Sequence, residues 1–162
     1  MLHINDRLVQ ASFNSSGRTG QPSAETASLF AYGTLTIDEV IAVLLDRVPT
    51  HYMAEAAGWR AVRLPERMYP GLVWSNHQVA CGRVYTGLTV EEWLTLDDFE
   101  DPAYQLRRVE VFPSATFPLA YVWPTVHDNT PWRVNDLSQQ QLAEYLDLCS
   151  RWRLRHRRTR KL

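Results

Sequence analysis

Three helices are predicted by the alternation of polar and apolar positions along the chain. Each begins at a capping-box pattern, in which the first side chain and the side chain three residues later bond each other's backbone N–H groups. The third helix also carries an apolar stripe at i, i+3, i+4 and i+7 spacing, so one of its faces is expected to pack on the core. The three patterns are Thr36–Glu39, Thr89–Glu92 and Ser138–Gln141.

Short apolar runs between these helices predict strands at residues 28–31, 51–64, 71–74, 78–86, 107–112 and 119–123. Glycine and proline lie where turns are needed, and the last two runs can pair as a hairpin. The order of strands and helices is not a strict β-α alternation, which argues against a doubly wound parallel sheet. The pattern predicts an α+β domain with a small mixed, mostly antiparallel β-barrel or curved sheet and flanking helices.

The length of 162 residues is typical of one domain. Residues 1–27 are polar and rich in Ser, Gly, Asn and Thr, so they are expected to form a flexible leader before a domain at 28–150. Seven of the 17 basic residues fall in a C-terminal tail at 151–162, which leaves residues 1–150 with a net charge of −8. This tail could bind an anionic partner such as nucleic acid. Pairing with the acidic body is the favoured alternative.

Several classes of protein are disfavoured by the composition. No apolar run approaches the ~20 residues of a membrane span, and the first residues lack the pattern of a signal peptide. Cys81 and Cys149 lie far apart, and the five histidines show no ligand spacing, so we expect no disulfide framework, no metal site and no cofactor. A cytoplasmic protein is expected, either a monomer or a homodimer.

Candidate chemistry lies at two points. The first apolar strand ends at Tyr32-Gly33-Thr34-Leu35, directly before a predicted helix, and such a junction gathers N–H groups that favour an anion. Glu100 ends the carboxylate-rich second helix, where neighbouring aspartates 97, 98 and 101 favour its neutral acid form, as suits a general base. Each feature alone is also typical of a plain strand end or a solvated helix end.

A family resemblance is carried by several motifs in order. They are Leu29–Leu35, Tyr69-Pro70-Gly71-Leu72-Val73, Val79-x-x-Gly82-x-Val84-Tyr85 and Leu96-Asp97-x-Phe99-Glu100-x-x-x-Tyr104, followed by Val109-x-Val111. Over residues 28–124 the chain resembles the gamma-glutamylcyclotransferase-like superfamily. The most similar branch holds the gamma-glutamylamine cyclotransferases and the plant avirulence-induced proteins.

The resemblance implies a small mixed barrel and an enzyme that releases 5-oxoproline from a small-molecule gamma-glutamyl compound without metal or nucleotide. It also implies that Tyr32, Gly33, Thr34 and Leu35 form the substrate loop and that Glu100 is the general base. Tyr104 either lines the pocket with its hydroxyl or is a core tyrosine.

Two departures from the family pattern concern the substrate. The position two after the family tyrosine is often basic, but it is Leu106 here, and the arginines follow at 107 and 108. Because a shift of one residue in a strand reverses the face, an arginine can point away from the pocket. The leader and the basic tail also have no counterpart in the family pattern. Both departures concern the identity of the substrate more than the class of reaction. Two alternatives to an enzyme stay open: an inactive protein of the same fold that binds a small metabolite, and a protein that binds an anionic partner through the basic tail.

Overall fold

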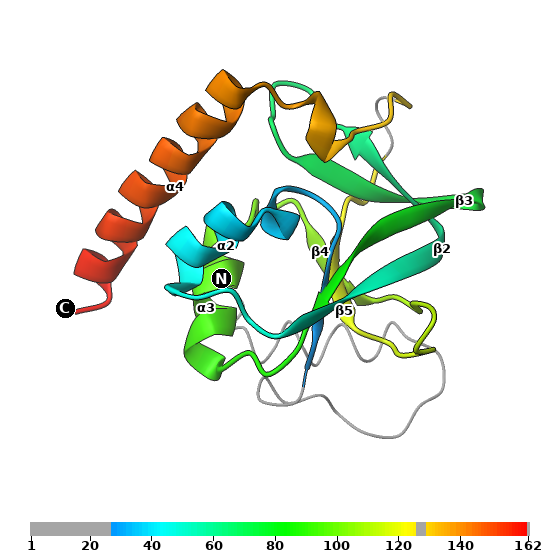
Figure 1. The fold of residues 1–162 in the computed structure, drawn as a ribbon, viewed down its shortest axis with the longest axis horizontal. Coiled ribbons are helices and arrows are strands. Elements are labelled where there is room, and N and C mark those ends of the chain that lie inside the picture. The colour runs from blue at the N-terminus through cyan, green and yellow to red at the C-terminus, as the bar shows by residue number, and fades with distance from the viewer. Residues whose placement is uncertain (1–26, 126–128, 162) are drawn as a thin grey trace.

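The computed structural model describes residues 27–125 and 129–161 as a five-stranded sheet with helices packed on one side (Figure 1). The predicted leader lies almost wholly outside the described residues. In chain order the elements are β1 (Leu29–Ala31), the 3₁₀ helix η1 (Thr34–Thr36), α2 (Asp38–Leu45), β2 (His51–Arg63), β3 (Pro70–Tyr85), α3 (Val90–Phe99), β4 (Gln105–Arg108), β5 (Leu119–Val122), η2 (Val134–Asp136) and α4 (Gln139–Thr159).

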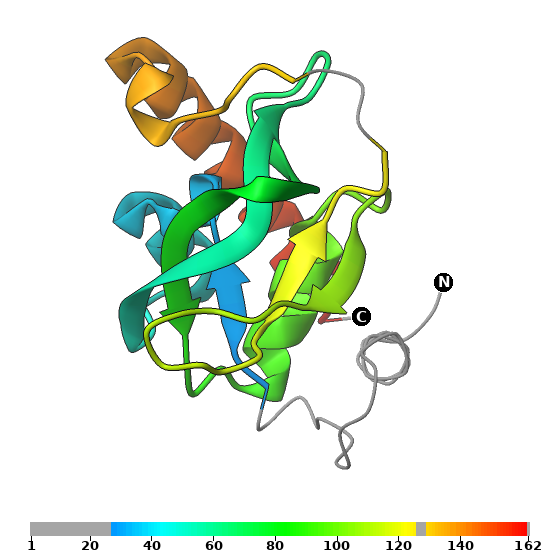
Figure 2. The ribbon, with the colours of Figure 1, turned by 90° about the vertical axis from the view of Figure 1, so that its right-hand side faces the viewer.

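The strand order in the sheet is β2-β3-β1-β5-β4. Three pairings are antiparallel (β2 with β3, β3 with β1, β4 with β5), and β5 lies parallel to β1. One further parallel contact joins Leu72 of β3 to Val122 of β5, so the sheet is strongly curved (Figure 2). The end strands β2 and β4 do not pair as ladders in the described part of the chain. Of the two predicted forms, the curved sheet is therefore present and the closed barrel is not.

Two apolar clusters hold this arrangement. One joins the helices to the sheet and includes Val40 and Ile41 of α2, Trp93 of α3 and Tyr145 of α4. The other is built only from strands and the segment that follows β4, with Phe30 of β1 among its fully buried members. The sheet therefore packs apolar side chains on both faces, as its long apolar runs require.

Two of the three predicted helix starts are confirmed. Thr89 and Ser138 each form a complete capping box. The box at Thr36 is wrong, because residues 34–36 form a 3₁₀ turn and the N-cap of α2 is Ile37, which makes no side-chain cap. The Thr36 hydroxyl instead donates to the Gly33 carbonyl at 2.6 Å.

The strand predictions are confirmed in position but wrong in their bounds. The runs at 71–74 and 78–86 form one long strand, β3, because the equally continuous β2 pairs with it and only a bulge at Ala57/Trp59 interrupts the register. The predicted hairpin exists as β4 with β5, in which Arg107 pairs with Ala120. Its first strand ends at Arg108, and beyond it Val111 forms only a single bridge, to Thr116.

The basic residues at 151–160 do not form a separate segment, because α4 continues through them to Thr159. Many of their side chains pair with carboxylates on α2 and α3 or beside them. The pairs are Arg153 and Arg157 with Asp46, His156 with Asp98, and Arg160 with Glu91. Contacts to the acidic body therefore fix α4, in line with the favoured alternative. Between residues 27 and 161, setting aside 126–128, no helix is long and apolar enough to cross a bilayer.

Candidate functional site

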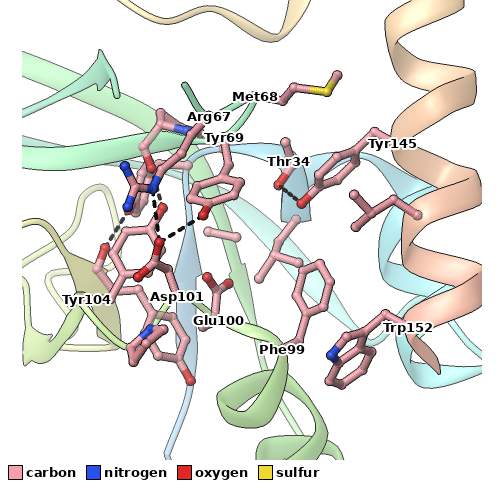
Figure 3. Close-up of a pocket in the computed structure, with 18 of the residues that line it drawn as sticks. Thr34, Arg67, Met68, Tyr69, Phe99, Glu100, Asp101, Tyr104, Tyr145 and Trp152 are labelled. Atoms are coloured by element: carbon pink, nitrogen blue, oxygen red, sulfur yellow. Dashed lines mark hydrogen bonds and ion pairs between the residues drawn. The ribbon is translucent and has the colours of Figure 1, made fainter. Parts of the chain in front are cut away.

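A pocket of about 660 Å³ lies where the loop after β1, the turn before β3, the end of α3 and one face of α4 meet (Figure 3). All six residues that the sequence places in the site line this pocket: Tyr32, Gly33, Thr34, Leu35, Glu100 and Tyr104. The fold thus brings together residues that lie about 70 positions apart in the sequence. The Tyr69-Pro70 turn and Tyr121 also line it.

The loop after β1 is held against the start of β3 by close contact. A Cβ added to Gly33 would lie 2.7 Å from Cδ and Cγ of Pro70, so only glycine fits there without displacing the turn. The structure differs from the sequence-based expectation in one respect. Because α2 begins at Asp38, its dipole is not at this loop. The 3₁₀ turn takes its place, and the first N–H groups of such a turn have no acceptor inside the helix.

Glu100 is the C-cap of α3, and its extended backbone turns the chain away from the helix axis. Its N–H still bonds the Leu96 carbonyl at 3.0 Å, which fixes the position of the residue. The side chain is half-buried and points into the pocket between Asp101 and Phe99 (Figure 3).

The three aspartates near Glu100 each have a partner of their own. Asp97 is buried and accepts the Tyr121 hydroxyl at 2.9 Å, while Asp98 lies 2.8 Å from Nε2 of His156. Asp101 accepts Nε of Arg67 at 3.0 Å and the Tyr69 hydroxyl at 2.9 Å. These contacts give each of the three carboxylates a structural role.

The cluster around Asp101 stabilises the pocket entrance. Burial opposes ionisation, but hydrogen bonds from the Ala103 N–H, Tyr69 and Arg67 lower the pKa of the Asp101 carboxyl. The Arg67 guanidinium also lies over the ring of Trp123, 5.0 Å from its centroid. Arg67 is therefore already engaged on both sides and holds the turn before β3 to the segment after α3.

Two tyrosines that line the pocket, the half-buried Tyr32 and the buried Tyr104, are held by hydrogen bonds to the backbone. The Tyr32 hydroxyl donates to the Tyr121 carbonyl at 2.5 Å and accepts the Leu72 N–H at 3.2 Å, and the Tyr104 hydroxyl donates to the Pro70 carbonyl. Burial and the neighbouring Glu100 charge raise the pKa of Tyr32; burial, the nearby Tyr32 and Glu100 do the same for the pKa of Tyr104. Both rings are therefore neutral and fixed in orientation.

The side of the pocket formed by α4 was not predicted as part of the site. Tyr145 lines it with its hydroxyl 3.1 Å from Oγ1 of Thr34, and Leu148 and Trp152 follow on the same face of the helix. Tyr145 and Trp152 belong to the apolar stripe that predicts a core-facing helix. The stripe is therefore the sequence signal that could have indicated this side of the pocket. Its spacing does not show whether the residues pack in a core or line a cavity.

Arg107 and Arg108, the basic residues that follow Tyr104, do not line the pocket. Leu106 is buried in the core, Arg107 donates to the Gln105 side chain at 2.8 Å, and Arg108 donates to the Phe117 carbonyl at 2.8 Å. Within the described parts of the chain, no group of three His, Cys, Asp or Glu residues is arranged to hold a metal.

Comparison with curated proteins gives relatives from one plant. The chain is 38% identical to AIG2-like protein C of Arabidopsis thaliana over 104 residues, which cover 62% of this chain and 60% of that protein. It is 33% identical to AIG2-like protein D of the same plant over 84 residues, covering 52% of this chain and 55% of the relative. The chain thus matches somewhat more than half the length of these relatives.

Solved structures share the fold. A solution structure of an Arabidopsis thaliana protein matches with a TM-score of 0.60 and 25% identity, covering 78% of this chain and 90% of that one. The crystal structure of an uncharacterized protein from Pyrococcus horikoshii matches with a TM-score of 0.55 and 15% identity, covering 74% of this chain and 97% of that one. The second likeness is one of fold alone.

A family model described as "Gamma-glutamyl cyclotransferase, AIG2-like" matches residues 29–145, more than two thirds of the chain. The match begins at β1 and ends at Tyr145, so it contains the loop, the turn before β3, Glu100 and the first tyrosine of the α4 face. The chain therefore belongs to the gamma-glutamyl cyclotransferase, AIG2-like family.

Proposed function

We propose that the pocket binds a gamma-glutamyl amide and converts it to 5-oxoproline and a free amine, with Glu100 as the general base. The observation that carries this proposal is the half-buried Glu100 side chain, which points into the pocket that the loop of residues 32–35 also lines. Membership of the family supports the same class of reaction.

The reaction is an internal transfer of an acyl group. The α-nitrogen of the glutamyl group attacks the γ-carbonyl carbon, a C–N bond forms to close a five-membered lactam, and the original amide C–N bond breaks. Two protons leave the α-ammonium, and both end on the released amine. Because nucleophile and electrophile are already tethered, holding the attacking conformation can supply about 7–11 kcal/mol of the barrier reduction.

Glu100 would transfer the first of these two protons from the α-ammonium to the departing nitrogen. Its carboxylate takes a proton from the α-ammonium, which frees the nitrogen lone pair, and returns the proton to the departing nitrogen. A general base in this role contributes about 10²–10⁴-fold to the rate. Asp97 does not line the pocket, and Asp101 binds Arg67 and the Tyr69 hydroxyl at the turn before β3.

The loop after β1 would hold the α-carboxylate or the oxyanion of the γ-carbonyl. The backbone N–H groups of Thr34 and Leu35, in the first turn of η1, are the donors suited to an anion. Tyr32 and Tyr104 would shape the pocket rather than transfer protons, because the proton of each hydroxyl is donated to a backbone carbonyl.

The alternative is a protein of the same fold that binds a metabolite without turnover. Incubating the protein with a panel of gamma-glutamyl amines and dipeptides, followed by mass spectrometry for 5-oxoproline, separates the two. Release of 5-oxoproline supports the enzyme. A folded protein that binds members of the panel and releases none would be a binding protein.

The compartment is part of the same proposal. Cys81 is exposed and Cys149 is buried, and both are free thiols. Free thiols without a disulfide framework fit a reducing compartment, so we propose that the reaction takes place in the cytoplasm.

A further inference from the structure

The half of the pocket beyond Glu100 is apolar. The rings of Phe99 and Trp152 make an edge-to-face contact with their centroids 5.0 Å apart. The Trp152 ring also stacks on the His156 ring, with 4.6 Å between centroids. Leu148 lies one turn before Trp152 and lines the same cavity, yet its side chain is 52% exposed. Figure 3 shows Phe99 and Trp152 facing the cavity on the α4 side.

This apolar surface lies directly beside the proposed base. Phe99 precedes Glu100 in the chain, and the bond between Thr34 and Tyr145 brings α4 against the loop of residues 32–35. A substrate whose α-carboxylate is held by that loop and whose scissile bond is near Glu100 would therefore extend its amine half along α4. A cavity of about 660 Å³ lies in the range that holds drug-sized ligands, which is larger than a glutamyl group needs.

The charges around the pocket restrict what this half can be. Among the described residues that line it, Arg67 is the lone arginine or lysine, and it already binds Asp101. The lining includes four carboxylates: Glu66, Asp98, Glu100 and Asp101. A carboxylate on the amine half would be repelled by them. The same carboxylates would attract a cation, but Asp98 and Asp101 already bind His156 and Arg67, and the surface along α4 presents the apolar side chains of Leu148 and Trp152.

We infer that Phe99, Leu148 and Trp152 form a subsite for an uncharged alkyl or aryl group on the amine half of the substrate. The inference rests on the proposed function, and it narrows the substrate class to gamma-glutamyl amides of apolar amines. Leu148 and Trp152 lie beyond residue 145, where the family match ends.

The test is calorimetric binding of a chain-matched series of gamma-glutamyl amides to the Glu100→Gln variant, in which turnover is blocked. The series is the ethylamide, the pentylamide, the 4-aminobutylamide with a cationic end, and the amide of 4-aminobutyrate with an anionic end. We expect the pentylamide to bind at least tenfold more tightly than each of the other three, because burial of added methylenes is favourable.

A matched pair of leucines on α4 provides the control. Leu148→Asn, made in the same background, should reduce the preference for pentylamide over ethylamide to less than threefold. Leu154→Asn should leave it unchanged, because Leu154 is similarly exposed, at 57%, but lies outside the pocket. Equal effects of the two substitutions would overturn the subsite, as would equal or tighter binding of either charged amide.

The reaction and the subsite can fail separately. Wild-type release of 5-oxoproline from the ethylamide, without a pentyl preference in binding, would retain the reaction and reject the subsite. A pentyl preference lost in Leu148→Asn, with no release from any amide, would retain the subsite and reject the reaction. Absence of binding by all four amides would reject both.

Discussion

The side-chain oxygens of Thr34 and Tyr145 lie 3.1 Å apart and join the loop after β1 to α4. Both residues are buried, and 111 positions separate them in the sequence. Since the loop and the helix form adjoining sides of the pocket, this bond holds the two sides together. The shape of the site therefore depends on a contact that neither local sequence motif contains.

Removing the Tyr145 hydroxyl should weaken the fold. In Tyr145→Phe the hydroxyl of Thr34, a side chain that is only 5% exposed, loses its partner on α4, and we expect a loss of about 0.5–1.5 kcal/mol in the free energy of unfolding. Urea titration followed by circular dichroism measures it. Tyr52→Phe is the control, because the Tyr52 hydroxyl bonds Thr116 at an exposed site and should matter less. Equal losses in the two variants would contradict the buried role of the Thr34–Tyr145 bond.

A methyl group at Gly33 should impair ligand binding more than it lowers the stability of the fold. In Gly33→Ala the new Cβ would press against Pro70, so the loop and the turn must move apart, and we expect binding of the gamma-glutamyl amide to weaken at least tenfold. Gly87→Ala is the comparison. Gly87 has a φ of +65° but open space around it, so its substitution should cost about 1 kcal/mol of stability and leave binding unchanged. Normal binding by Gly33→Ala would show that the close contact with Pro70 is not needed.

Alkaline pH should destabilise the protein through its buried tyrosines. Burial raises the pKa of Tyr85 to about 12, and its hydroxyl donates to the Leu35 carbonyl at 2.6 Å. In the unfolded chain a tyrosine loses its proton near pH 10. Between about pH 10 and 12 the unfolded state therefore binds fewer protons than the folded state, and stability falls as pH rises. Below pH 10 this contribution is present in full.

Urea midpoints measured at pH 9, 10.5 and 12 test this dependence. Tyr85→Phe removes one of the titrating groups and should make the decline shallower, although its stability at pH 9 is lower because the bond to Leu35 is lost. A midpoint that stays constant or rises between pH 10.5 and 12 would contradict the assignment.

Local signals in the sequence were sufficient for part of the fold. The capping boxes at Thr89 and Ser138 could be predicted because both partners of each reciprocal bond lie within four residues. The box at Thr36 failed because residues 34–36 form a 3₁₀ turn, which moves the N-cap of α2 to Ile37. The extent of β3 depends on pairing with β2, which no window of local sequence contains.

The same distinction applies to the site. Gly33 and Glu100 could be found from their motifs, because a strand that breaks at glycine and a carboxylate at a helix end are visible locally. Leu148 and Trp152 could not, since helical spacing places residues on one face without saying what that face meets. Arg67 was also missed, because its role comes from its contact with Asp101 across 34 positions.

The central claim is that Glu100 is the base of a reaction that releases 5-oxoproline. The most direct measurement compares the rate of 5-oxoproline release by the wild type, Glu100→Gln and Glu110→Gln, with folding checked by circular dichroism. Glu110 is exposed and lies outside the pocket, so its substitution controls for the loss of one carboxylate. We predict a loss of about 10²–10⁴-fold in Glu100→Gln and a wild-type rate in Glu110→Gln. A folded Glu100→Gln variant that releases 5-oxoproline at the wild-type rate would contradict the account.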